Sequence, residues 1–180
     1  MAYIFDFVIL AVIYVVFFHK RWRKVESDVS LIFHLFYLYI CLVVFVTLMP
    51  FQLPIPGVFG TNNLFWKSIN WIPFIDLIAN NGNALWEVIL NVIMLVPFGF
   101  LVPFIKRHNA LWTIGLALLF SLAIETMQLF YVWAGSKASR TFDITDLITN
   151  TFGAFIGYII FLIFRPTTKR IFKKSEKHHT

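Results

Sequence analysis

Charged residues are scarce in this sequence. They make up only 13% of its 180 residues, whereas 59% are hydrophobic, and the mean hydropathy is +0.79. Soluble domains usually carry about 25% charged residues, so water is not the main solvent of this chain. The composition excludes an ordinary soluble domain and predicts an all-α membrane protein.

Cysteine is also nearly absent. The single Cys41 lies within an apolar run, so neither a disulfide framework nor a thiolate metal site is indicated. The five histidines show no ligand spacing with cysteine or acidic residues, so we expect no metal and no cofactor. Lys and Arg exceed Asp and Glu by 15 to 9, but they lie in short runs between apolar stretches. This pattern indicates membrane lipid as a partner and no nucleic acid.

Five apolar runs approach the roughly 20 residues that a helix needs to cross a bilayer. They cover about residues 3–18, 31–49, 86–105, 111–133 and 143–164. The first is not read as a signal peptide, because its basic residues follow the apolar run and no small-residue cleavage site is visible. We therefore expect a bundle of about five transmembrane helices over 1–165, a single domain, followed by a basic tail over 166–180.

Between the second and third runs the sequence changes character. Pro50, Pro54 and Pro56 cannot continue a helix, so a loop begins there. The stretch 69–77 mixes aromatic and polar side chains and is too short to span. It predicts an interfacial or re-entrant segment between the second and third helices.

Orientation follows from the basic residues of the short loops. The loops after the first and third runs and the tail after 164 hold most of them, and all three fall on one side. The positive-inside rule places that side in the cytoplasm. We expect an N-terminus outside the membrane and a cytoplasmic C-terminus.

Polar residues then gather at the outer ends of the last three spans. With about 1.5 Å of rise per residue, this topology brings them into one outward-facing layer, with Arg140 in the loop just before the fifth span. Glu125 and Gln128 are three residues apart, so they project from one helical face. The predicted ligand-binding residues are Asn91, Glu125, Gln128, Arg140, Asp143, Asp146 and Asn150.

Structural roles compete with this interpretation. Asp143 and Asp146 occupy positions typical of an N-cap and a first-turn acid. Asn91 and Asn150 have the residue type that bonds across membrane helices. Glu125 differs, because an acid well inside an apolar span costs at least ~2.5 kcal/mol to insert and is by default a candidate for a functional role.

The glycines of the fifth span have a structural interpretation. Gly153 and Gly157 form a Gly-x-x-x-Gly spacing, which predicts a close helix contact.

Several motifs together resemble the VanZ-like family, whose prototype is associated with teicoplanin resistance in bacteria. The resemblance covers about residues 70–160. It is carried by Asn70, Ile72, Pro73 and Phe74, by Glu87 and Asn91, by Pro97-Phe98-Gly99, by Ser121 and 125–128, and by Arg140, Asp143, Asp146, Asn150 and Gly153. It implies a bacterial cell membrane and lowered susceptibility to teicoplanin-type lipoglycopeptides.

Two mechanisms remain open at this point. In the first, the polar cleft binds or shields an amphiphile such as a lipid-linked cell-wall precursor or a lipoglycopeptide. In the second, an intramembrane enzyme modifies a lipid or glycolipid headgroup, with Glu125 as general base and Asp146 orienting the substrate or binding metal. Ser121 is one turn from Glu125, but no histidine accompanies it as a nucleophile–base pair requires. A transporter is a third hypothesis, weakened by the lack of an internal repeat.

Overall fold

The structure, a computed structural model, describes residues 2–22, 27–51, 65–105, 109–135 and 141–176. It describes the side chains of all of these except 2, 27, 28 and 166–176. Within this part of the chain, five helices are long and apolar enough to cross a membrane, which confirms the predicted all-α bundle. The first span comprises α1 (Ala2–Ile13), a π-helical segment (Tyr14–His19) and α2 (Lys20–Trp22), and the others are α3 (Ser27–Leu48), α5 (Ala84–Ile105), α6 (Ala110–Trp133) and α7 (Ile144–Glu176).

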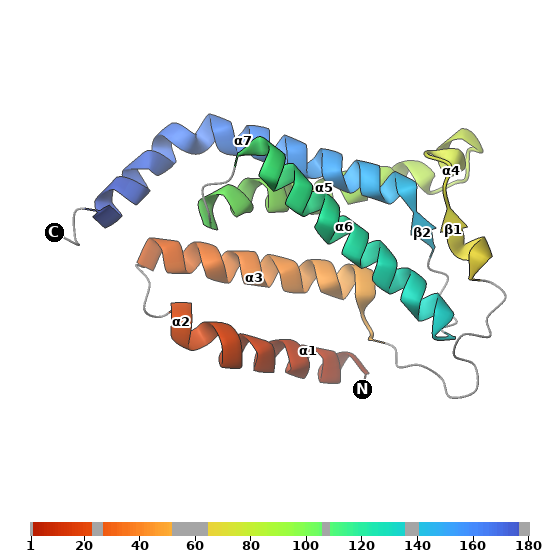
Figure 1. Cartoon of the computed structure of the whole chain (residues 1–180), viewed down its shortest axis with the longest axis horizontal. Coiled ribbons are helices and arrows are strands. Elements are labelled where there is room, and N and C mark those ends of the chain that lie inside the picture. Colours follow the sequence, from red (N-terminus) through yellow and green to blue (C-terminus); the bar gives the residue numbers. More distant parts are fainter. Residues whose placement is uncertain (1, 23–26, 52–64, 106–108, 136–140, 177–180) are drawn as a thin grey trace.

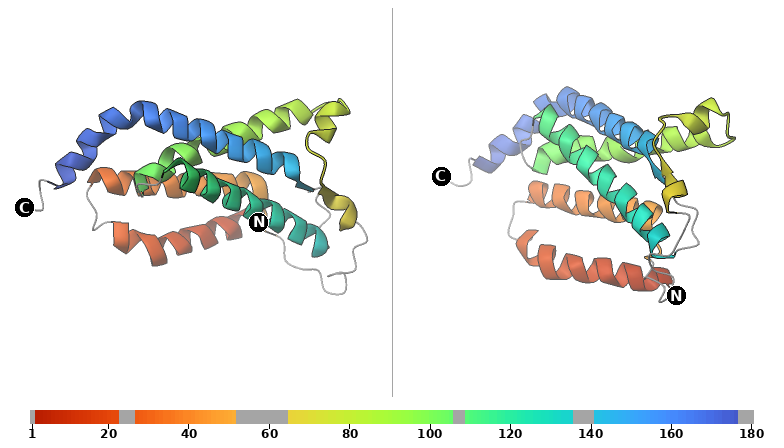
Figure 2. Two further views of the ribbon diagram at one scale, coloured as in Figure 1. Left: turned by 45° about the horizontal axis from the view of Figure 1, so that its top comes forward. Right: turned by 45° about the vertical axis from the view of Figure 1, so that its right-hand side comes forward.

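The five helices alternate in direction. α1, α5 and α7 begin at one end of the bundle, where α3 and α6 finish (Figure 1). We call this the N-terminal end and the other the opposite end. The first span and α3 lie side by side along one flank of the group formed by α5, α6 and α7 (Figure 2). Polar residues near the starts of α5 and α7 and the last turns of α6 therefore share one end.

The first span is longer than the sequence predicted. It continues past residue 18 to Trp22, which is only 8% exposed. The Trp22 ring stacks on Phe18 and Phe33, with centroid distances of 4.7 and 5.3 Å. Because stacked aromatic pairs add to the free energy gained by burial, they hold this last turn against α3. The apolar run alone gave no sign of this packing.

The last helix also passes its predicted limit. Its apolar, membrane-crossing part ends at Arg165, close to the predicted 164, but α7 continues to Glu176. The basic tail predicted for 166–180 is therefore helical over most of its length.

Short elements fill the connection between α3 and α5, where a non-spanning segment was predicted. They are a 3₁₀ turn (Trp66–Ser68), β1 (Ile69–Asn70) and α4 (Ile75–Ile78). β1 pairs in parallel with β2 (Phe142–Asp143), with Ile69 opposite Phe142 and Asn70 opposite Asp143. Figure 1 shows α4 at the N-terminal end of the bundle, beside the start of α5. The segment thus docks on the residues that open α7.

The closest helix packing is between α5 and α7. A Cβ atom on Gly153 would lie 2.1 Å from the carbonyl oxygen of Val92, and one on Gly157 would lie 2.0 Å from that of Val96. Only glycine fits such a backbone approach, so the contact predicted from the Gly-x-x-x-Gly spacing is confirmed. It fixes how far α7 can shift along α5.

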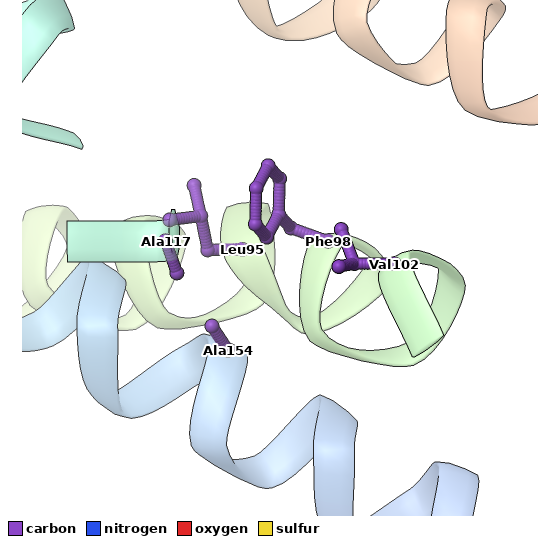
Figure 3. Close-up of a cluster of buried hydrophobic side chains, with 5 residues drawn as sticks. All are labelled: Leu95, Phe98, Val102, Ala117 and Ala154. Atoms are coloured by element: carbon purple, nitrogen blue, oxygen red, sulfur yellow. The ribbon is translucent and has the colours of Figure 1, made fainter. Parts of the chain in front are cut away.

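A buried apolar cluster lies beside this contact and joins the three last spans. Figure 3 shows its side chains, which come from α5, α6 and α7: Leu95, Phe98, Val102, Ala117 and Ala154. Leu95, Ala117 and Ala154 are fully buried. This cluster therefore belongs to the helices that carry the polar residues.

Candidate functional site

The site is built around the start of α7. Asp143 ends β2 and precedes the first residue of α7, so it is the N-cap. Its Oδ1 accepts a hydrogen bond from the backbone N–H of Thr145 at 2.7 Å, which satisfies one of the free donors at a helix start. Its Oδ2 accepts from the Asn70 side-chain amide at 2.9 Å. Both carboxyl oxygens of Asp143 thus have structural partners.

Glu125 reaches the same point from α6. Its side chain is only 2% exposed, and its Oε2 accepts a hydrogen bond from the backbone N–H of Asp143 at 3.0 Å. The donor lies at the end of the two-residue strand, so the strand pair and α6 meet at this bond. A hydrogen bond to a carboxyl group in an apolar span offsets part of its insertion cost. Glu125 is therefore held inside the bundle, facing protein and not lipid.

Asp146 lies one turn into α7 and faces α5. Its Oδ1 accepts a hydrogen bond from the side-chain amide of Asn91 at 2.6 Å. Asn91 therefore forms a hydrogen bond between helices, which is the structural interpretation considered for it from the sequence. The bond joins α5 to α7 close to the glycine contact, since Asn91 is next to Val92 on α5.

A small cavity separates these acids from the α4 segment. Its volume is about 20 Å³, enough for about one water molecule. Four acidic residues line it, together with apolar and backbone groups: Asp76 and Glu87, Asp143 and Asp146, and Phe74, Leu77, Ala84, Val88 and Thr145. The carboxyl oxygens of these residues favour hydrogen-bond donors or cations in the cavity.

One turn deeper, α7 meets α6 through a second polar pair. The Asn150 amide donates to the hydroxyl oxygen of Ser121 at 2.9 Å, and both side chains are buried. Asn150 Oδ1 is the one buried side-chain polar atom without a partner in the described part of the chain. It is an unused acceptor within the bundle.

The residues of the site come from the α4 segment, the β1–β2 pair and the last three spans, and the whole set lies within residues 36–165. A family model described as VanZ/LLP1 matches that segment. The chain belongs to the VanZ/LLP1 family. It is also 34% identical over 121 residues to Protein VanZ of Enterococcus faecium. That alignment covers 67% of this chain and 66% of the relative, and no solved structure matches.

One predicted site residue of this VanZ/LLP1 chain, Gln128, makes its contact away from the acids. Gln128 donates from its side-chain amide to the carbonyl oxygen of Thr47 on α3, at 3.2 Å. Its position on α6 thus serves a contact with α3. Arg140 lies outside the described residues.

Sequence reasoning missed two contributors to the site. Asn70 was noted only as part of a family motif, yet its side chain binds the carboxyl group of Asp143. Phe74 adopts a left-handed backbone conformation with φ 59°, and its N–H donates to the Thr145 hydroxyl at 3.0 Å. A non-glycine residue in that region is uncommon and often marks a functional site. The motif containing both was the available signal.

A metal centre is not formed by the described residues of this family member. Four acidic residues border the small cavity, but no group of three His, Cys, Asp or Glu in the described ranges is placed to hold a metal ion. The arrangement instead offers carboxyl acceptors beside backbone and amide donors. Chemically, it suits recognition of a group that donates hydrogen bonds.

Proposed function

We propose that this membrane protein lowers susceptibility to teicoplanin-type lipoglycopeptides by binding or shielding an amphiphile at the N-terminal end of the bundle. The amphiphile is a lipid-linked cell-wall precursor or the drug itself. One observation carries the proposal: Glu125 is buried in α6 and bonded to Asp143 at the start of α7. The contact lies within the segment matched to the VanZ/LLP1 family.

The proposed position of the site is extracellular. Lys20 and Arg21 are exposed at the opposite end of the bundle. Arg165 is also exposed, at the residue where the membrane-crossing part of α7 ends. Basic residues of short loops concentrate on the cytoplasmic side. The N-terminal end then faces the outer leaflet, where lipid-linked precursors and lipoglycopeptides are found.

The chemistry of the site supports a ligand that donates hydrogen bonds. The cavity between α4, α5 and α7 is lined by carboxyl groups from Asp76, Glu87, Asp143 and Asp146. Sugar hydroxyls and ammonium groups are donors of this kind. Exposed aromatic side chains of the same end, Trp71 and Trp86, are typical of the membrane interface where the tail of an amphiphile would enter.

Catalysis on a headgroup is less well supported by the geometry. Ser121 is fully buried, and its hydroxyl oxygen is engaged by Asn150. Glu125 Oε2 accepts a hydrogen bond from the backbone N–H of Asp143, so this oxygen has a structural role. A general base must reach the proton that it removes. Binding therefore accounts for more of the arrangement than turnover does.

Drug susceptibility tests the proposal. Expression in a susceptible Gram-positive host should raise the inhibitory concentration of teicoplanin more than that of vancomycin, because burial of an acyl chain contributes ~0.8 kcal/mol per CH₂. Glu125→Gln should remove the difference while the protein still accumulates in the membrane. Thr126→Ala is the matched control, since Thr126 is exposed and donates only within α6. Equal protection against both drugs would contradict recognition of the lipid tail.

Lipid and precursor analysis of the same strains separates the two mechanisms. Binding leaves the composition of lipids and cell-wall precursors unchanged, whereas turnover produces a modified headgroup that disappears with Glu125→Gln. Detection of such a product would overturn the binding proposal.

Orientation has a separate test. In a Cys41→Ala background, Lys67→Cys should react with an impermeant thiol reagent on intact cells and Lys20→Cys should not, because these exposed residues lie at opposite ends of the bundle. The reverse labelling would place the site in the cytoplasm and refute its extracellular role.

A further inference from the structure

A second recess lies away from the acids, between α3, α5 and α6. Its volume is about 450 Å³ and its lining is entirely apolar. The lining side chains are Phe36 and Ile40 of α3, Phe98, Val102 and Ile105 of α5, and Leu116 and Phe120 of α6. They come from the last turns of α5 and the first half of α6, so this recess belongs to the opposite end of the bundle.

The recess follows from where the three helices are tied together. The Tyr39 hydroxyl donates to the carbonyl oxygen of Met94 at 2.8 Å, and Gln128 donates to that of Thr47. The first bond joins the middles of α3 and α5, and the second joins α6 to α3 near the N-terminal end. Toward the opposite end α6 diverges from α3, as Figure 1 and the right view of Figure 2 show. The rings of Phe98 and Phe120 stack with their centroids 5.3 Å apart and line the recess where the helices separate.

The size of the recess favours one occupant. An α-helix with its side chains is about 10–12 Å wide and rises 5.4 Å per turn, so a single turn would fill this volume. A water molecule takes about 30 Å³ in the liquid, and a methylene group also has one heavy atom. The recess thus has a volume equal to that of roughly fifteen such groups. A single acyl chain, which is narrower than a helix, fits this volume.

Charge at the same end selects the headgroup. The recess reaches Ile105, the last residue of α5, so its mouth opens at the opposite end of the bundle. Lys20 and Arg21, at the end of the first span, are exposed there, and Arg165 is exposed on α7. Basic residues at a membrane surface attract anionic lipids.

We infer that this recess binds one acyl chain of an anionic phospholipid, whose headgroup lies among the basic residues of the opposite end. The site is independent of the acidic site, since no lining residue is shared between them. The bound chain completes the packing of α3 against α5 and α6. Phosphatidylglycerol is a suitable probe of this chemistry.

Photo-cross-linking tests the inference. The full chain would be reconstituted in phosphatidylcholine vesicles with a trace of phosphatidylglycerol that carries a diazirine on one acyl chain. We expect cross-links on the peptides that contain Phe36, Phe98 and Leu116. The same diazirine on phosphatidylcholine should give several-fold fewer of them. Equal yields from both lipids would overturn the selection of an anionic headgroup.

Two substitutions from facing walls fill the recess. Leu116→Trp on α6 and Ile40→Trp on α3 should each reduce these cross-links several-fold, whereas Leu119→Trp, on a residue that is 62% exposed, should leave them unchanged. Far-UV circular dichroism and size exclusion identify which filled variants remain folded. Undiminished cross-linking in either folded variant, or cross-links spread evenly over exposed faces, would refute the site. Protein–protein cross-links through the recess would assign it to a second chain instead.

Discussion

The first and last spans of this protein are both apolar enough to cross a membrane, yet they are buried very differently. In the membrane-crossing part of α7, 44% of the residues are buried inside the protein. The corresponding share is 6% in the first span and 6% in α3. α7 packs on α5 through glycines and carries Asp146 and Asn150, whereas α1 exposes Ile4, Phe5 and Val8 along its length. Apolarity therefore reports which segments enter lipid, and burial reports which of them form the functional core.

The largest effect should come from the glycine contact of the core. Gly153→Ala should lower the free energy of unfolding by about 3 kcal/mol, because its Cβ would lie 2.1 Å from the Val92 carbonyl oxygen and overpacking of a tight contact is costly. Gly115→Ala is the matched control, since nothing lies within 4 Å of its added Cβ. Thermal unfolding of the purified variants in detergent measures both. Similar losses in the two variants would mean that this contact does not distinguish the core.

A smaller effect is expected at the start of α7. Asp143→Ala removes the cap on Thr145 and the acceptor for Asn70, so it should cost about 2 kcal/mol, near the upper end for an N-cap. Thr47→Val is the comparison from α3, one of the two less buried spans. The Thr47 hydroxyl donates only to the carbonyl oxygen of Val43 within its own helix. It should change stability by no more than about 0.5 kcal/mol. A larger loss for Thr47→Val would place the more sensitive contacts in α3.

The smallest effect concerns the buried pair between α6 and α7. A double-mutant cycle with Ser121→Ala and Asn150→Leu should give a coupling energy of about 0.6 kcal/mol, the usual size for polar pairs between membrane helices. The unused Asn150 Oδ1 already lacks a partner, so its removal offsets part of the lost bond. A coupling of several kcal/mol would show that this contact with α6, rather than the glycine contact with α5, contributes most to holding α7 in the bundle.

The spans could be predicted because their signal is carried by composition over about 20 residues. All five were placed, with errors at the ends: the extension to Trp22 depends on ring contacts with Phe33 from the next helix. The β1–β2 pairing could not be predicted, since two residues are too few to show an alternating pattern. Its consequence, the bond from Asn70 to Asp143, was missed for the same reason.

The polar residues illustrate a second limit. Glu125 and Gln128 were correctly placed on neighbouring positions of one helix, but three residues are about 60° apart around its axis. That angle is enough for Glu125 to reach Asp143 while Gln128 reaches Thr47 on α3. Sequence spacing predicts a shared face, and only the positions of the neighbouring helices decide which contact each residue makes.

The bond between Glu125 and the backbone of Asp143 has a consequence for biogenesis. Residue 125 is synthesised before its donor, so a nascent chain whose last span has not yet left the ribosome holds an unsatisfied acid in an apolar helix. Insertion of α7 supplies the donor and, through Gly153, the close contact with α5. A chain truncated before residue 141 should therefore be recognised as incomplete by membrane proteases, although four of its five spans are present.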